Sequence, residues 1–294
     1  MKNLKHIFIF VLFSFQANLF SQFGGTCSPK LIKERFLKST VLIISTGFDE
    51  MDERLKLGFE KYWEHTDYKF VARDYKYSTS DKSISYLVPV TMTVEDNLSS
   101  QQYNRYALIM GGDEDIFKRT VADVVLDNFS HEKYVVDATY RATGIVKMMH
   151  DFIEMKIDGA KVNGQTITKV RYNSGFVYNK KSSKIKGKTL LISKSSMTYG
   201  KYYPFDTKGR PVFDKEKFKE LYKHKVKFVS DEELQEHIDN GTEDYCYLLP
   251  VFARKKYIFV IDCETESVLY NGYSPSGLSI KSADIKKLNK AVSN

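Results

Sequence analysis

The motifs that mark the common enzyme classes are missing from this chain of 294 residues. It has no G-x-x-x-x-G-K-[ST] phosphate loop, no H-E-x-x-H, no G-x-S-x-G, no C-x-x-C and no G-x-G-x-x-G. Its six histidines are scattered, and no two stand at metal-ligand spacing on one predicted element. We therefore expect a non-enzymatic protein without a cofactor or metal. The alternative is a secreted or periplasmic hydrolase whose active-site residues are dispersed along the chain.

Long apolar runs are equally scarce, and the one at the N-terminus is short. The chain begins MKNLKHIFIFVLFSFQANLFSQ, in which Lys2 and Lys5 precede the apolar stretch 7–15 and Ser21 is a small residue suited to cleavage. This order predicts a secretory signal peptide over residues 1–21, with a buried N-terminal helix as the alternative. No later run approaches the length of a transmembrane helix. We expect an exported protein, either periplasmic or secreted.

Neither sign of charge dominates. Loss of the signal peptide removes two of the 45 basic residues, which leaves 43 against 37 Asp and Glu, or +6. So small an excess favours solubility over any particular partner. Together with export it argues against nucleic acid, and the expected partner is a protein or a glycan.

Periodic segments in the second half predict alternating strands and helices. Asp214 is a suitable N-cap for a helix over 214–224. Ser230 and Glu233 form a capping box for a second helix, which Gly241 ends. Apolar runs complete a β-α-β-α-β-β order with the strands KTLLIS (188–193), VKFV (226–229), YCYLLPVF (245–252) and YIFVIDC (257–263).

The first half repeats this order with similar text, which we interpret as an internal duplication. An amphipathic helix follows its first strand, with an apolar stripe of Met51, Leu55, Phe59, Tyr62 and Trp63. The matching strands are TVLIIS (40–45), YKFV (68–71), SYLVPVTMTV (85–94) and YALIMGG (106–112). The proline in YLVPV and in its counterpart YLLPV suits an edge strand, or a strand whose other neighbour needs no donor at that position.

Between the copies, apolar residues recur every three or four positions, which predicts a long amphipathic helix. They are Val135, Ala138, Ala142, Ile145, Met149 and Phe152. Because the run covers only two or three heptads, we favour packing into the core over a coiled-coil contact. The lysines of YNKKSSKIKGK (178–188) favour a solvated linker over an anion-binding strip.

The predicted fold class is α/β (α+β), with two related β-α-β-(α)-β-β modules joined by a long amphipathic helix. The expected segments are the signal peptide (1–21), the first module (38–130), the connecting helix (131–160), the lysine-rich linker (161–187) and the second module (188–294).

Four segments of the second module are similar in order and pattern to those of a known family: KFVS, EEL, DYCYLLPV and IDCETESVLY. Together they resemble the small α/β module of exported and periplasmic bacterial proteins, of the type found in the N-terminal domain of TolB and in the curli-secretion lipoprotein family. The likeness covers residues 188–270 well and 40–112 loosely. It implies an interaction or assembly domain rather than a catalyst. This chain departs from the pattern because it lacks the lipid-anchor cysteine and carries a long helix between modules.

Two acidic clusters are alternative cation sites, and each has a simpler interpretation. Asp49, Glu50, Asp52 and Glu53 open a predicted helix, where negative charge complements the helix dipole. The GGDED segment (111–115) lacks the ligand spacing of a calcium loop and is typical of a polar turn. Neither cluster is predicted to bind a metal.

Three cysteines allow one disulfide and one remaining thiol. If the loop of the last hairpin is symmetric about 254–255, Cys246 lies opposite Cys263 at a distance suited to a disulfide. The alternatives are two buried thiols, or a loop of odd length that shifts the register by one residue.

The copies differ most in the segment after the first strand of the second module. There an insertion interleaves aromatic and basic side chains, which suits stacking on sugars or a protein contact. The candidate binding residues are Tyr199, Tyr202, Tyr203, Phe205 and Arg210. The alternative is a lid whose aromatic side chains cover the sheet edge.

Overall fold

The fold is known from a computed structural model. It describes residues 23–24, 27–95, 100–127, 142–159, 161–162, 165–166, 181–193, 196, 198–199, 210–211, 214–252, 256–274 and 280–294. The predicted signal peptide lies outside these ranges and stays a prediction. Within them, no helix has the length and apolar character needed to cross a membrane.

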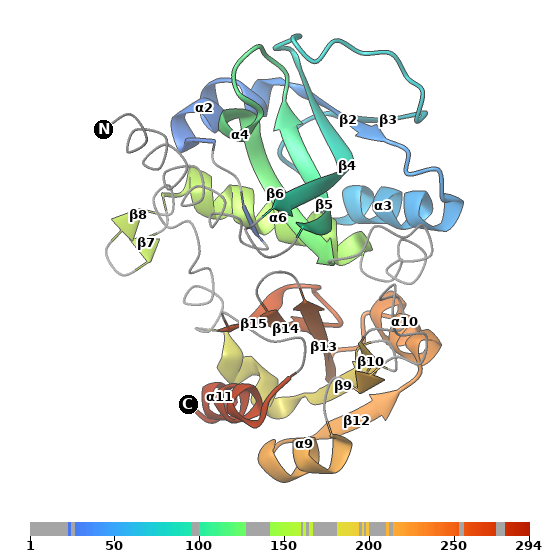
Figure 1. Ribbon diagram of the computed structural model, residues 1–294, viewed down its shortest axis with the longest axis vertical. Helices are drawn as coiled ribbons and strands as arrows, with labels where there is room; N and C mark the ends of the chain where they lie inside the picture. The colour runs from blue at the N-terminus through green and yellow to red at the C-terminus, as the bar shows by residue number, and fades with distance from the viewer. Residues whose placement is uncertain are drawn as a thin grey trace, which may run out of the picture.

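The first sheet combines six described strands in the order β1-β6-β5-β4-β2-β3 (Figure 1). β2 is parallel to β3 and β4, whereas β4, β5 and β6 are antiparallel neighbours. The strands are β1 (Phe23–Gly24), β2 (Thr40–Ile44), β3 (Tyr68–Val71), β4 (Ile84–Glu95), β5 (Ser100–Met110) and β6 (Thr120–Asp127). The helical elements beside them are α2 (Pro29–Glu34), η1 (Phe36–Lys38), α3 (Asp49–Tyr62) and α4 (Ile116–Arg119).

The second sheet has the order β12-β9-β13-β14-β15, which repeats the order β3-β2-β4-β5-β6 of the first. Its strands are β9 (Thr189–Ser193), β12 (Val226–Val229), β13 (Tyr245–Phe252), β14 (Lys256–Asp262) and β15 (Val268–Ser274). Its helices are α9 (Lys215–Leu221), α10 (Asp231–Asp239) and α11 (Ser282–Ser293). The predicted α+β class and the two related modules are confirmed.

The repeated text occupies equivalent positions in the two sheets. Tyr86 of YLVPV pairs with Leu42 of β2, and Tyr247 of YLLPV pairs with Leu191 of β9. Both strands are internal, so the edge-strand interpretation of their proline is wrong. The parallel ladders end at residues 87 and 247, before either proline is reached. The neighbouring parallel strand therefore requires no donor from the proline.

The helix starts predicted from Asp214 and Ser230 are confirmed, whereas the first of these helices ends at Leu221 instead of residue 224. Asp214 accepts hydrogen bonds from the first backbone N–H groups of α9, and the Ser230 hydroxyl accepts from Glu233 N at 3.1 Å. The Glu233 carboxylate pairs with Lys227. Gly241 follows α10 with a φ of 55°, a left-handed conformation that favours glycine.

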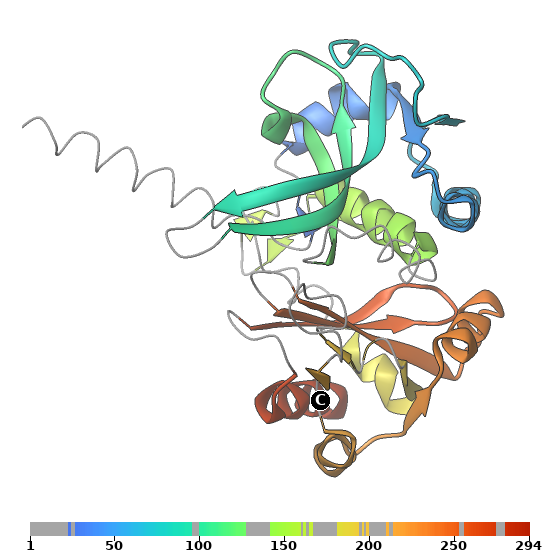
Figure 2. The same cartoon turned by 45° about the vertical axis from the view of Figure 1, so that its right-hand side comes forward.

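Helix α6 (Ala142–Ile157) lies between the two sheets (Figures 1 and 2). Its buried residues, among them Ile145, Met149 and Phe152, belong to one hydrophobic cluster, the central core, which also contains residues of α3, α10 and both sheets. The expected core packing is confirmed. Residues 131–141, with Val135 and Ala138, lie outside the described ranges, so a single connecting helix over 131–160 stays a prediction.

The two sheets turn opposite faces toward the central core. Tyr86 packs in a separate cluster on the far face of the first sheet, whereas its counterpart Tyr247 lies in the central core. Leu87 lies in the central core, whereas its counterpart Leu248 packs beside α9 and α11. The reason is that α3 and α9 cover equivalent faces of their own sheets. The residues of α3 pack in the central core between the modules, whereas Phe218 of α9 packs in the separate cluster of the second module.

Glu266 connects the second module to the first. It lies between β14 and β15 and accepts hydrogen bonds from Tyr62 of α3 at 2.9 Å and from Thr143 of α6. Lys61 Nζ lies 3.7 Å from the same carboxylate, which is only 2% exposed. Among the described residues other than glycine, only Glu266 has a positive φ, of 50°.

The predicted linker 161–187 contains ordered structure. A short antiparallel pair joins β7 (Lys161–Val162) to β8 (Gln165–Thr166), and a 3₁₀ helix, η3, spans Ser182–Gly187. Ile185 of η3 is buried in the second module, and the Ser182 hydroxyl donates to Ala291 O of α11 at 2.6 Å. The end of the segment therefore packs onto the second module through Ser182 and Ile185, whereas Lys181, Lys184 and Lys186 are exposed, as expected of a solvated lysine run. Residues 167–180 lie outside the described ranges.

Candidate metal centre

The predicted aromatic loop has a stem in which its two ends meet. β10 (Thr198–Tyr199) and β11 (Arg210–Pro211) pair in antiparallel register, with Tyr199 opposite Arg210. Tyr202, Tyr203 and Phe205 lie outside the described residues, so their role in binding stays a prediction. The stem follows β9 and therefore begins near the carboxyl end of a parallel strand.

The predicted disulfide is absent. Cys27, Cys246 and Cys263 are buried free thiols. Phe252 pairs with Lys256, so an odd number of residues separates the strands and Cys246 lies opposite Asp262. A shift of one residue turns a side chain to the other face of a sheet. Cys246 accordingly packs beside α9 and α11, whereas Cys263 lies in the central core.

The acidic clusters have protein partners. Asp52 of α3 accepts hydrogen bonds from the Ser45 hydroxyl and from Thr46 N, at 2.5 and 2.8 Å. In the GGDED turn, Glu114 forms an ion pair with Arg35 at 2.6 Å. Asp49, Glu50 and Asp52 lie in the first turn of α3, where the helix dipole favours negative charge, but no side chain caps this helix.

The structure brings together three metal-ligand side chains that the sequence separates. His65 lies between α3 and β3, and His150 and Glu154 are one turn apart on α6. The close crossing of α3 and α6 at Gly58 makes this possible. A Cβ atom there would lie 2.9 Å from Val146 Cγ2, so only glycine lets the helices approach this closely.

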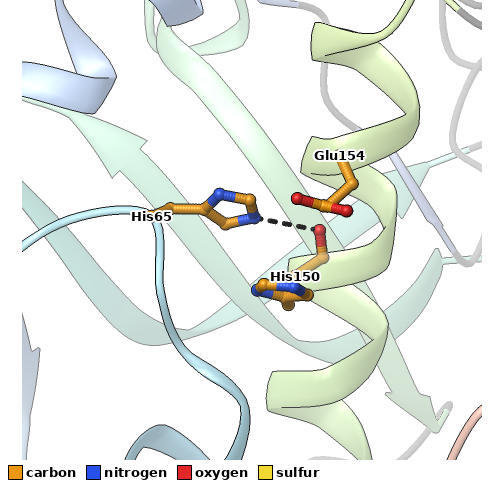
Figure 3. Close-up of side chains that lie close together, drawn as sticks. All are labelled: His65, His150 and Glu154. Atoms are coloured by element: carbon orange, nitrogen blue, oxygen red, sulfur yellow. Dashed lines mark hydrogen bonds between the residues drawn. The ribbon is translucent and has the colours of Figure 1, made fainter.

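One potential ligand atom from each side chain lies within 4.8 Å of the other two (Figure 3). His65 Nε2 donates to the backbone oxygen of His150 at 3.1 Å. The two imidazole rings are stacked with their centroids 4.3 Å apart and their planes at 22°. The centroid of the His65 ring also lies 5.4 Å from that of the Trp63 ring, and the two ring planes are at 89°.

The electrostatic surroundings favour a neutral His150. Burial lowers its pKa, and the neighbouring His65 and Lys147 side chains lower it further. Its Nδ1 atom is buried and has no hydrogen-bond partner among the described residues. A neutral imidazole carries a lone pair on one nitrogen, which is the form that binds a metal.

Two imidazoles and one carboxylate form a donor set that suits zinc and related ions, and three protein ligands leave a fourth position for water or substrate. The spacing of the histidines relative to one another does not predict this cluster, because its ligands on α6 are one histidine and one glutamate. The spacing of four between His150 and Glu154 on a predicted helix was an available signal. No sequence pattern links them to His65.

Comparison of the chain with protein families, with curated proteins and with solved structures finds no match.

Proposed function

We propose that this protein is an exported, non-enzymatic α+β protein that acts as an interaction or assembly component in the periplasm or outside the cell. The observation that carries the proposal is the pairing of Tyr199 with Arg210. It brings the two ends of the segment 200–209 together after β9, and the carboxyl end of such a strand is the side on which α/β sheets tend to bind ligands. The resemblance to envelope-assembly modules adds support. The expected partner is a protein or a glycan.

The test is capture of partners from envelope fractions on the mature chain. In the test variant, residues 200–209 are replaced by Asn-Gly, which suits a two-residue hairpin and keeps the stem. A Tyr202→Ala/Tyr203→Ala variant removes the stacking surface, and a Lys201→Ala/Lys208→Ala variant is the matched control for charge. We expect the first two to lose the captured partner with an unchanged circular dichroism spectrum. Unfolding of the tyrosine variant would instead identify the loop as a lid.

The second candidate function is a secreted or periplasmic hydrolase with a dispersed active site. The observation that favours it is the set of His65, His150 and Glu154, since three protein ligands and an open position are typical of catalytic zinc. The mature protein, loaded with Zn²⁺, should then hydrolyse a member of a panel of ester, phosphate and peptide substrates. His150→Gln should abolish that activity. Absence of turnover in the zinc-loaded protein would reject this candidate.

A further inference from the structure

We infer that His65, His150 and Glu154 form a binding site for a divalent transition-metal ion of the zinc type, at the junction of α3 and α6. The inference does not depend on the proposed binding function of the loop 200–209. It concerns a different part of the fold, on the first module.

The donor set selects the class of ion. Mg²⁺ and Ca²⁺ bind through oxygen ligands, whereas imidazole nitrogen suits zinc, cobalt, nickel and copper. Two of the three side chains in this cluster offer nitrogen. The site should therefore bind Zn²⁺ and discriminate against Mg²⁺.

The present geometry is close to a coordinating one. Zinc ligands lie about 2.1 Å from the ion, which places two of them about 3.4 Å apart around a tetrahedral centre. The potential ligand atoms already lie within 4.8 Å of one another. Because the lone pair of an imidazole lies in the ring plane, the stacked rings of His65 and His150 must turn apart to face one ion. His65 and His150 are half-buried and Glu154 is exposed, and the turn of His65 would exchange its Nε2 hydrogen bond to the His150 oxygen for the ion.

The backbone beneath the site is held in place before an ion arrives. His150 and Glu154 have a fixed spacing on α6, where Ile153 is fully buried in the central core. Trp63, two residues before His65, is 7% exposed, and its Nε1 donates to Thr66 Oγ1 at 3.1 Å. A site on a fixed backbone loses little conformational entropy on binding, which favours affinity.

Trp63 supplies the readout, because it is the only tryptophan in the chain and its ring meets that of His65. Zn²⁺ is added to the metal-free mature protein while tryptophan fluorescence is recorded, and Mg²⁺ is added in a parallel titration. The variants are His65→Gln, His150→Gln and Glu154→Gln. The matched control is His237→Gln, since His237 is also half-buried and packs against an aromatic ring, that of Tyr245 at 4.3 Å.

We expect a saturable change with one Zn²⁺ per chain and no response to Mg²⁺. Each ligand variant should bind Zn²⁺ at least about tenfold more weakly, and His237→Gln should bind as the wild type does. Glu154→Gln keeps the test decisive if a histidine variant misfolds, because this side chain is exposed. Wild-type Zn²⁺ affinity in folded Glu154→Gln, or in a folded histidine variant, would overturn the inference. So would the absence of a saturable response to Zn²⁺, by fluorescence and by calorimetry, in the wild type.

Discussion

Substitution of Glu266 tests whether one buried carboxylate fastens the second module to α3 and α6. In Glu266→Ala, the hydrogen bonds from Tyr62 and Thr143 and the contact with Lys61 are lost together. Glu266→Gly loses the same contacts but relieves the backbone, because the φ of 50° is unfavourable for any residue with a Cβ atom. The pair of variants therefore separates side-chain bonding from backbone strain.

The expected loss follows from the contacts. A hydrogen bond to a charged group contributes about 1.5–3 kcal/mol. Two such bonds are lost, but the cost of burying the carboxylate disappears with them, and that cost is what raises the pKa of Glu266. We expect Glu266→Ala to lower the free energy of unfolding by about 3 kcal/mol. Glu266→Gly should lose about 1 kcal/mol less, since the left-handed conformation costs about that much.

The measurement is urea unfolding of wild type and both variants, followed by circular dichroism and by Trp63 fluorescence. Coincident unfolding transitions by circular dichroism and by fluorescence justify the two-state treatment. A Glu266→Ala variant as stable as the wild type would refute the claim that these bonds hold the modules together. A Glu266→Gly variant less stable than Glu266→Ala would refute the assignment of strain to this residue.

Two further predictions concern Gly111 of the first module and Lys156 of α6. Gly111→Ala should lower the free energy of unfolding by about 3 kcal/mol, because the added Cβ would lie 1.8 Å from the Asp81 carbonyl oxygen. The measurement is a thermal melt. The control is Gly187→Ala, whose added Cβ would have no atom of the described residues within 4 Å apart from its chain neighbours. Burial lowers the pKa of Lys156 from 10.5 to about 8, so as the pH rises the folded chain loses the Lys156 proton at a lower pH than the unfolded chain does. Stability measured by urea unfolding should therefore rise between pH 8 and 10.5, relative to Lys156→Met, by about 3 kcal/mol. Equal slopes for the two proteins would contradict it.

Local patterns were sufficient for the elements that recur in the two modules, whereas α2, β6 and α11 were not predicted. Asp214 and Ser230 cap the helices that they were predicted to cap, since a short polar side chain can satisfy exposed N–H groups without any tertiary contact. The strand VKFV begins and ends at the predicted residues. The recurrence of one strand-helix order also predicted two sheets of one topology. These features depend on neighbours in the chain, which a single sequence contains.

The candidate metal site and the cysteine pairing depend on contacts between distant segments. His65 and His150 are 85 residues apart and meet only because α3 and α6 cross closely at Gly58. The register of the last hairpin depends on its loop, and a difference of one residue separates Cys246 from Cys263 on opposite faces. A local sequence pattern predicts neither the contact between His65 and His150 nor the register of Cys246 and Cys263.

The sequence by itself determined the strands and helices that recur in two matching sets, because hydrophobic periodicity and capping act within a few residues, but it left α2, β6 and α11 unpredicted. The tertiary structure decided which face of each sheet is buried in the central core. YLVPV and YLLPV have nearly the same text, yet Tyr247 lies in the central core, whereas Tyr86 packs on the far face of the first sheet. A residue's burial depends on which helices cover its face, and the packing of the two modules around α6 sets that cover.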